Sequence, residues 1–552
     1  MTPASPELGG VPLPVDIPSK SGSKLERLGF QSPQGIFRSI LFSDGQDVSA
    51  ETSQGALEYS SDLNLDQIVE AVTAGRDEYD LKPFFWSSIA SIDQIYYRQE
   101  VFRDLEIRSL LDNIQLFSGE MRQMRARLTR AEKFYFKYQK QALFLDAVAA
   151  YCGAVSQLAR ELSSAQLGSR GFQGLRAYLI DYVSSDGFHT LAAETDLLRS
   201  DLNSIQYSVD ISGKRITVAK FGGEPDFSTE VLRTFEKFRQ EASKDYQFKV
   251  SSWPEMNHVE AAIMDRVARL FPEIFARLKR FPEQNRRYLD DVIARFDREI
   301  QFYTAWIAFK GRIETLGLRF CYPTIATSKD IHANDTFDVA LADKLVERRQ
   351  PVVTNSFSLD GPERILVISG PNQGGKTTFA RMFGQLHHLS CLGCPVPGTS
   401  ARLFLFDRLF THFERQEDLQ NLSGKLENEL QRIRGILERA TNNSVLIMNE
   451  SFLSTTLNDA LFLSKQIMNR IIGMDMLCVT VTFLDELSTL GDSTVSMVSS
   501  IDPQDPAIRT FKIVRRPADG RAYAAAIAQK YHLSGDAIVE RIEANAERSK
   551  PS

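Results

Sequence analysis

A glycine-rich loop that carries one lysine and two threonines is the clearest chemical feature of the sequence. Residues 370–378 read GPNQGGKTT and follow the apolar run ILVIS at residues 365–369. They fit the pattern G-x-x-x-x-G-K-[ST] between a strand and a helix, a context that a chance glycine-rich turn does not explain. Glycines let backbone N–H groups turn toward phosphates, the lysine supplies a cation, and the following hydroxyl is a Mg²⁺ ligand. The loop therefore predicts a site for ATP and Mg²⁺.

The whole loop is predicted to hold the nucleotide, with a second strand supplying acidic chemistry. The loop residues are Gly370, Pro371, Asn372, Gln373, Gly374, Gly375, Lys376, Thr377 and Thr378. The apolar run SVLIM at 444–448 leads directly into Asn449 and Glu450. A carboxylate beside phosphate and metal can act as general base toward water, so Glu450 and Lys376 are the predicted catalytic residues.

Thr377, Asn449 and Glu450 are the predicted metal ligands. Asn449 stands where an aspartate is expected. An amide keeps the hydrogen-bonding shape of a carboxylate but loses its charge. We therefore expect weakened metal affinity or slow turnover.

The elements that must position these residues fall into two regions. Residues 63–317 show mainly helical spacing, as at 92–114 and 146–165, with one predicted β-hairpin near 205–221. From residue 318, strand-length apolar runs at 365–369, 444–448, 476–482, 494–500 and 509–514 alternate with helical patterns. The predicted fold is α plus α/β: a tail and lead-in at 1–62, a long-helix core and lever region at 63–317, and a P-loop α/β ATPase domain at 318–552.

Composition restricts the class of protein. The 552 residues include 65 Lys plus Arg and 71 Asp plus Glu, for a net charge of −6, and 43% are hydrophobic. These values indicate a soluble chain with cores and argue against a uniformly basic nucleic-acid coat, although a local basic patch stays open. Five cysteines are too few for a disulfide framework. With no secretion signal and no apolar membrane span, a cytoplasmic location is expected.

Several segments in order resemble the ATPase domain of the MutS family of DNA mismatch repair proteins. GPNQGGKTTFARMFGQ resembles the family's GPN-x-GGK-[ST]-T loop, and LGCPVPGTSARLFLFDRLFTHF resembles its segment from a G-x-x-V-P-A turn to a D-R-[IL]-F-T-R strand. FKIVRRPADGRAYAAAIAQKYHLSGDAIVERI resembles the family's closing stretch. The resemblance covers residues from about 320 to 545, and the upstream helices with RQEVFRDL are similar to the family's core and lever helices more loosely.

The resemblance implies roles for further residues. Asn355, in Val353-Thr354-Asn355, is similar to the segment that contacts adenine, while Thr455 and Asp459 match a loop at the contact between two ATPase domains. EDLQNLSGKLENEL at 417–430 resembles the subunit-crossing signature, with Gly424 at the serine position. Phe483 stands where the family has a γ-phosphate-sensing histidine. Together with Asn449, these departures predict slow or specialised ATP use.

The implied function is that of an ATP-dependent, homodimeric clamp on double-stranded DNA in mismatch repair or related DNA maintenance, with other repair proteins as further partners and no nuclease activity. The family reads mismatches with a Phe-x-Glu pair in an N-terminal domain. The letters occur here only at 271–273 and 281–283, where helix packing explains them better. The alternative is an ATP-binding regulatory or structural protein of the same fold that has lost mismatch recognition.

Two smaller features have both a functional and a structural interpretation. The segment 122–140 carries seven Arg and Lys residues among aromatic residues, and it is either a phosphate-binding surface or an ordinary solvated helix face. Cys391 and Cys394 form an isolated C-x-x-C, which together with His387 and His388 is expected to serve packing and not metal binding.

Overall fold

The chain folds into two compact units in the computed structural model, which describes residues 37–43, 57–87, 89, 91–213, 215–223, 256–414, 424–452, 454–502, 509–518 and 539. Of the described residues, unit 1 contains Phe37 and those in Ile107–Leu167 and Phe172–Asp297. Unit 2 contains those in Arg38–Glu106, Gly168–Gly171 and Arg298–Ser552. Residues 1–36 of the predicted tail and lead-in, residues 417–423 of the segment that resembles the subunit-crossing signature, and the closing stretch beyond residue 518, apart from residue 539, lie outside the described residues.

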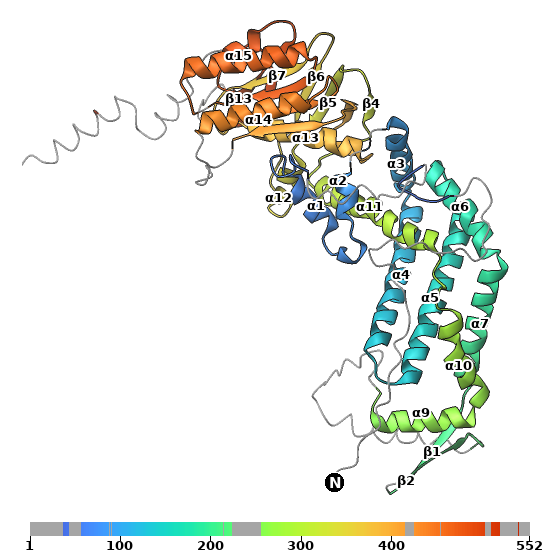
Figure 1. The fold of residues 1–552 in the computed structure, drawn as a ribbon. Helices are drawn as coiled ribbons and strands as arrows, with labels where there is room; N and C mark the ends of the chain where they lie inside the picture. Colours follow the sequence, from blue (N-terminus) through green and yellow to red (C-terminus); the bar gives the residue numbers. More distant parts are fainter. Residues whose placement is uncertain are drawn as a thin grey trace, which may run out of the picture. The chain divides into compact units, whose positions relative to one another are not determined.

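Unit 1 consists of long helices and one hairpin, as the spacing of its apolar residues predicts. Its elements are α4 (Arg108–Lys133), α5 (Lys137–Ser164), α6 (Arg170–Val183, which begins in unit 2), α7 (Asp186–Asn203), β1 (Tyr207–Ser212), β2 (Arg215–Lys220), α9 (His258–Leu270), α10 (Pro272–Gln284) and the start of α11 (Asp291–Glu314). The helices α4, α5 and α7 run alongside one another (Figure 1). The strands β1 and β2 pair antiparallel, which confirms the predicted hairpin.

Helix α5 also meets the length and composition of a membrane span, contrary to the expectation that no such stretch exists. Its most apolar window has a mean hydropathy of 1.5, but 61% of that window is buried inside the protein. Its buried side chains include Val148, Tyr151 and Val155. A helix in the core of a helical bundle meets the same length and composition, because neighbouring helices cover it on most sides.

The Phe-Pro-Glu segments of unit 1 have structural roles. Phe271 precedes α10 and Pro272 occupies its first turn, where a missing N–H costs nothing. Phe281 is buried inside the same helix. This agrees with the packing interpretation of both segments.

Unit 2 is built on a six-stranded sheet in the order β10-β11-β12-β7-β13-β14. Its strands are β7 (Ile365–Ser369), β10 (Leu409–Phe413), β11 (Val445–Asn449), β12 (Leu477–Val481), β13 (Thr494–Ile501) and β14 (Arg509–Arg515). All neighbours are parallel except β13 and β14. The five strands predicted from apolar runs are all present, so the α/β class of this region is confirmed.

Helices cover this sheet and bury its apolar side chains. The helices are α13 (Lys376–Cys391), α14 (Lys425–Arg439) and α15 (Leu457–Gly473). One core joins strand residues such as Val367 and Met448 to Ile433 of α14 and Met468 of α15. In Figure 1, α14 and α15, both coloured orange, lie over the strands of the sheet. Strands buried on both faces read as continuous apolar runs, which is why they were predictable.

A second sheet and a group of short helices complete unit 2. The sheet has the order β4-β9-β5-β6, formed by β4 (Thr324–Ala326), β9 (Ser400–Phe404), β5 (Ile331–Thr336) and β6 (Asn355–Leu359). A two-stranded pair joins β3 (Phe320–Cys321) to β8 (Val396–Pro397). The helices are α1 (Leu65–Thr73), α2 (Lys82–Trp86), α3 (Ile92–Asp104), α12 (Val339–Val346) and most of α11. The predicted boundaries at residues 62 and 317 remain predictions.

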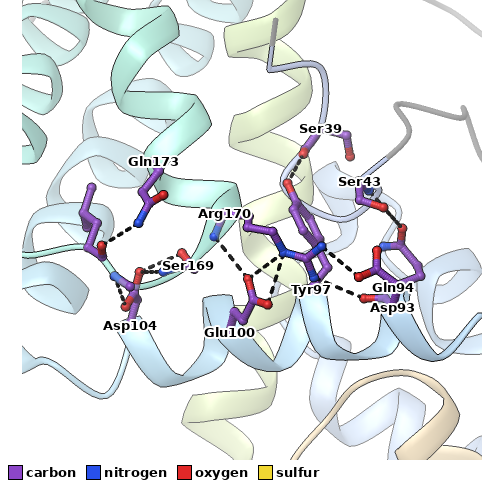
Figure 2. A network of polar contacts seen from close by, with 12 residues as sticks. Ser39, Ser43, Asp93, Gln94, Tyr97, Glu100, Asp104, Ser169, Arg170 and Gln173 are labelled. Carbon is purple, nitrogen blue, oxygen red and sulfur yellow. Dashed lines mark hydrogen bonds and ion pairs between the residues drawn. The ribbon is translucent and has the colours of Figure 1, made fainter. Parts of the chain in front are cut away.

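The helix α3 holds the segment Gly168–Gly171, where α6 begins, through charged contacts (Figure 2). Arg170 donates from Nε to both carboxylate oxygens of Glu100, at 3.1 and 3.0 Å, and from Nη1 to Asp93 Oδ1 at 2.8 Å. Asp104 Oδ2 accepts from the backbone N–H of Ser169 at 2.9 Å and from its hydroxyl at 2.6 Å. This segment is therefore fixed at several points along one helix.

Candidate nucleotide-binding site

The glycine-rich loop lies at the carboxyl end of β7, the strand between β12 and β13. It ends at Gly375, the residue that precedes the first turn of α13. Crevices at the carboxyl ends of parallel strands are the usual ligand sites of such sheets, and a helix N-terminus favours anions. The fold therefore brings the predicted loop into the position that phosphate binding requires.

Glycine is required in this loop for two physical reasons. Gly370 and Gly375 have φ values of 112° and 89°, a backbone region that other residues rarely adopt. At Gly374, a Cβ would lie 2.2 Å from Ser499 Oγ, and that hydroxyl donates to the Gly374 carbonyl at 2.8 Å. Ser499 is fully buried on β13. Ser499 thus supports the loop from the neighbouring strand.

The ammonium group of Lys376 is turned into its own loop. Its Nζ donates to the carbonyls of Gly370 at 2.7 Å and Pro371 at 3.3 Å, and it lies 4.3 Å from the ring centroid of Phe483. Burial lowers the pKa of Lys376, with the nearby charge of Arg509 acting in the same direction, while Glu450 and Asp485 oppose the shift. The lysine is thus a desolvated cation with a carboxylate within electrostatic reach, which suits a phosphate ligand.

The structure brings the three predicted metal ligands to one place. Thr377 Oγ1 donates to Asn449 Oδ1 at 3.0 Å, so the first turn of α13 meets the end of β11. Glu450 follows Asn449 directly, and its backbone N–H donates to the Val481 carbonyl at 2.9 Å. A hydroxyl, an amide oxygen and a carboxylate are the oxygen donors that Mg²⁺ accepts when phosphates and water complete its shell. This donor set fits Mg²⁺.

Asn355, predicted to contact adenine, is engaged with the edge strand β14. Its Nδ2 donates to the Phe511 carbonyl at 3.1 Å, and its Oδ1 accepts from the Ile513 N–H at 2.7 Å. Phe511 has a φ of 56°, is 48% exposed and lies 3.7 Å from the Cβ position of Gly375. An exposed ring beside the loop offers a face on which a base could stack. The adenine contact of Asn355 itself stays a prediction.

Four residues around the loop were missed by the sequence interpretation. Phe483 was noted only as a departure from a family pattern, and Ser499, Arg509 and Phe511 were not singled out. Arg509 Nε donates to the Asn372 carbonyl at 3.2 Å. Only strand pairing brings these residues to the loop, so no local signal in the sequence could have identified them.

The remaining predicted residues lie on α13, in the turn that follows it and at the start of α15. Thr455 and Asp459 sit at the start of α15, where Thr456 caps the helix by accepting from the Asp459 N–H at 3.3 Å. Cys391 and Cys394 are buried free thiols, and burial raises the pKa of Cys391 to about 12. His387 and His388 are buried on α13. Within the described part of the chain no group of three or more His, Cys, Asp or Glu residues could hold a metal ion.

The strand, the glycine-rich loop and the helix that follows it, with Thr377 against the end of β11, define a P-loop nucleotide-binding domain. Residues 366–548 match the family model described as MutS domain V. This part of the chain is therefore similar to domain V of the MutS family.

Similar proteins are consistent with this family. The chain is 27% identical over 286 residues to the DNA mismatch repair protein MutS of Shouchella clausii, which covers 50% of this chain and 32% of that protein. It is 30% identical over 216 residues to the MutS protein of Exiguobacterium sp., covering 37% and 25% of the two chains. For Psychrobacter cryohalolentis the values are 30% over 164 residues, covering 30% and 16%. The aligned parts thus span a third or less of these relatives.

Proposed function

We propose that this protein is an ATP-dependent DNA-binding ATPase of the MutS type, acting in DNA mismatch repair or related DNA maintenance in the cytoplasm. The observation that carries the proposal is the contact between Thr377 and Asn449, which joins the phosphate loop to the strand end that precedes Glu450. The match to MutS domain V and the names of the similar proteins support it.

Each residue of the site has a distinct task in this proposal. Lys376 turns from its loop carbonyls to the β- and γ-phosphates, and the N–H groups of the loop bind the phosphate oxygens. Mg²⁺, when bound with ATP by Thr377, Asn449 and Glu450, supplies positive charge that stabilises the charge developing on the phosphates. Glu450 accepts the proton of the attacking water. The ring of Phe511 stacks on the base.

A homodimer is part of the same proposal. Leu457 and Phe462 of α15 are 71% and 62% exposed, and α15 begins seven residues after Glu450 by the numbering. Large apolar side chains on the surface next to a reaction site are typical of an interface. A second copy of the chain would cover them and complete the ATP site.

Double-stranded DNA is the proposed partner, and switching of a clamp by ATP is the proposed consequence. The basic segment 122–140 supports DNA binding less than its sequence suggests. Lys137 lies 3.2 Å from Asp265, Arg127 donates to the Asp146 carbonyl at 3.2 Å, and Arg125 pairs with buried Asp297. Cations that are paired within the protein are less available to phosphates.

The test is steady-state ATP hydrolysis with and without homoduplex, mismatched and branched DNA at low salt. We expect DNA to change the rate and to be retained by the protein, with retention decreasing as salt increases. Lys376→Ala should abolish hydrolysis and serves as the control for contaminating ATPases.

The alternative is an ATP-binding regulatory or structural protein of the same fold. If ATP binds but no DNA changes the rate or is retained at low salt, this alternative replaces the DNA proposal. Light scattering at working concentrations, with and without ATP, tests the dimer separately.

A further inference from the structure

The turn that carries Glu450 has a strained backbone. Glu450 has a φ of 52° and Phe452 a φ of 65°, both in the left-handed region. This region costs residues other than glycine about 1 kcal/mol or more each, and it persists only where the surroundings enforce it. The surroundings of this turn therefore determine where the Glu450 carboxylate points.

Two hydrogen bonds hold the turn from two different elements. The Glu450 N–H donates to the Val481 carbonyl of β12 at 2.9 Å. The Phe452 N–H donates to Glu429 Oε1 of α14 at 3.2 Å. The first bond continues the sheet, whereas the second depends on one carboxylate side chain. Phe452 is itself buried in the core between the sheet and α14.

Glu429 is a buried carboxylate with a buried histidine beside it. His412 of β10 is 1% exposed, and its Nε2 lies 3.7 Å from Glu429 Oε1. Burial works to raise the pKa of Glu429, but His412, the Phe452 N–H and the charge of Lys425 outweigh it, so the pKa is lowered. The ionised carboxylate is the stronger acceptor for the Phe452 N–H.

This pair carries unused hydrogen-bonding capacity. Among the described residues, Glu429 Oε2, both ring nitrogens of His412 and Ser451 Oγ have no hydrogen-bond partner. Burying such atoms is costly, and apolar side chains in place of a buried ion pair are often neutral or stabilising.

We infer that Glu429, supported by His412, is a positioning residue for ATP hydrolysis, which holds the Glu450–Phe452 turn so that the Glu450 carboxylate faces the γ-phosphate. The inference rests on the proposed ATPase function. It links α14 to the catalytic turn, because a displacement of this helix would move Glu429 and release the Phe452 N–H. A small misplacement of a catalytic group can cost about 100-fold in rate.

The test compares Glu429→Ala with Glu429→Gln, which keeps a neutral acceptor. For Glu429→Ala we expect kcat to fall by about tenfold or more while the dissociation constant for ATP stays within about twofold. Glu429→Gln should recover most of kcat. Glu438→Ala, on the exposed face of the same helix, is the matched control and should leave both values unchanged.

A double-mutant cycle tests the contribution of His412. His412→Ala should lower kcat, and combining it with Glu429→Ala should add little, because both changes release the same turn. Independent, additive losses would contradict the role given to His412.

Hydrogen exchange provides a readout that does not depend on activity. In the nucleotide-free protein, the peptide covering residues 450–456 should exchange faster in Glu429→Ala than in the wild type, with Glu429→Gln between them. The inference is overturned if Glu429→Ala exchanges at the wild-type rate in this peptide. It is also overturned if Glu429→Ala weakens ATP binding by the same factor by which it lowers kcat. If the wild type binds ATP without hydrolysing it, the proposed function fails, whereas the exchange result still decides whether Glu429 holds the turn.

Discussion

The ring of Phe483 lies over the ammonium group of Lys376, with 4.3 Å between Nζ and the ring centroid. Phe483 follows β12 and is 44% exposed, so its ring contacts the ammonium group while remaining partly accessible to solvent. The same ammonium already donates to two carbonyls of its own loop. With Asn372 Oδ1 at 3.5 Å as a further acceptor, a phosphate must compete with four groups for this cation.

Replacing Phe483 by alanine should strengthen ATP binding. A cation–π contact is worth about 0.5–1 kcal/mol at an exposed site and about 2 kcal/mol when the cation is desolvated, as Lys376 is, so its loss from the free protein corresponds to roughly two- to thirtyfold tighter binding. Titration calorimetry with ATP measures the change. Phe511→Ala is the matched control on the other side of the loop, where we expect weaker binding because a stacking face is removed. Equal effects of the two variants would contradict the distinct positions of the rings.

Asn449→Asp should increase metal affinity and turnover. The amide oxygen of Asn449 already accepts from Thr377, so an aspartate fits the same position and adds the charge that an amide lacks. The Mg²⁺ concentration at half-maximal hydrolysis should decrease and kcat should rise. A kcat identical to that of the wild type removes the basis for attributing slow turnover to Asn449.

Two buried histidines on α13 should make the protein sensitive to acid. His388 Nε2 donates to the Phe85 carbonyl at 2.9 Å, because a carbonyl can only accept, and Nδ1 lies 3.2 Å from the Tyr59 hydroxyl. Burial lowers the pKa of both His387 and His388 to about 4. Between pH 6.5 and 4 the unfolded chain binds more protons than the folded one. The stability that depends on keeping these two histidines neutral is therefore fully present above pH 6.5 and is lost as the pH falls toward 4.

Urea unfolding at pH 7.5 and 5.5 measures this loss. The expected decrease is about 1 kcal/mol for each buried histidine at pH 5.5. His388→Gln should reduce the difference between the two pH values by that amount. His189→Gln, at an exposed position of α7, should leave it unchanged. An unchanged pH dependence in His388→Gln would show that His388 is not neutral in the folded protein.

The parts of the site that the sequence predicted are those in which local pattern and structure coincide. The run at 365–369 is buried on both faces, and the loop after it must contain glycine at positive φ, so strand, loop and helix were all recognisable. The contact between Thr377 and Asn449 arises because the parallel sheet places the carboxyl ends of β7 and β11 at one edge.

What the sequence did not reveal depends on register and on polar strands. Ser499 reaches Gly374 because β13 pairs with β7 so that Val498 lies opposite Ser369. Strand β5 reads IHANDT, whose polar residues give no strand pattern, although it pairs with both β6 and β9. Tertiary pairing determined both features, and no propensity of the single segments predicts them.

Gly171→Ala should destabilise unit 2 by about 1–3 kcal/mol, the usual cost of overpacking. A Cβ at Gly171 would lie 2.8 Å from Ile40 Cδ1, 2.9 Å from Val101 Cγ2 and 3.1 Å from the Tyr97 hydroxyl. All three atoms are buried, so none can move away without disturbing the contacts of α3. Gly153→Ala is the matched helical control, since a Cβ there meets nothing within 4 Å and alanine favours the helix by about 0.5–1 kcal/mol. Urea unfolding should thus give changes of opposite sign for the two substitutions, and a stabilised Gly171→Ala variant would show that the segment Gly168–Gly171 is not packed against α3 in solution.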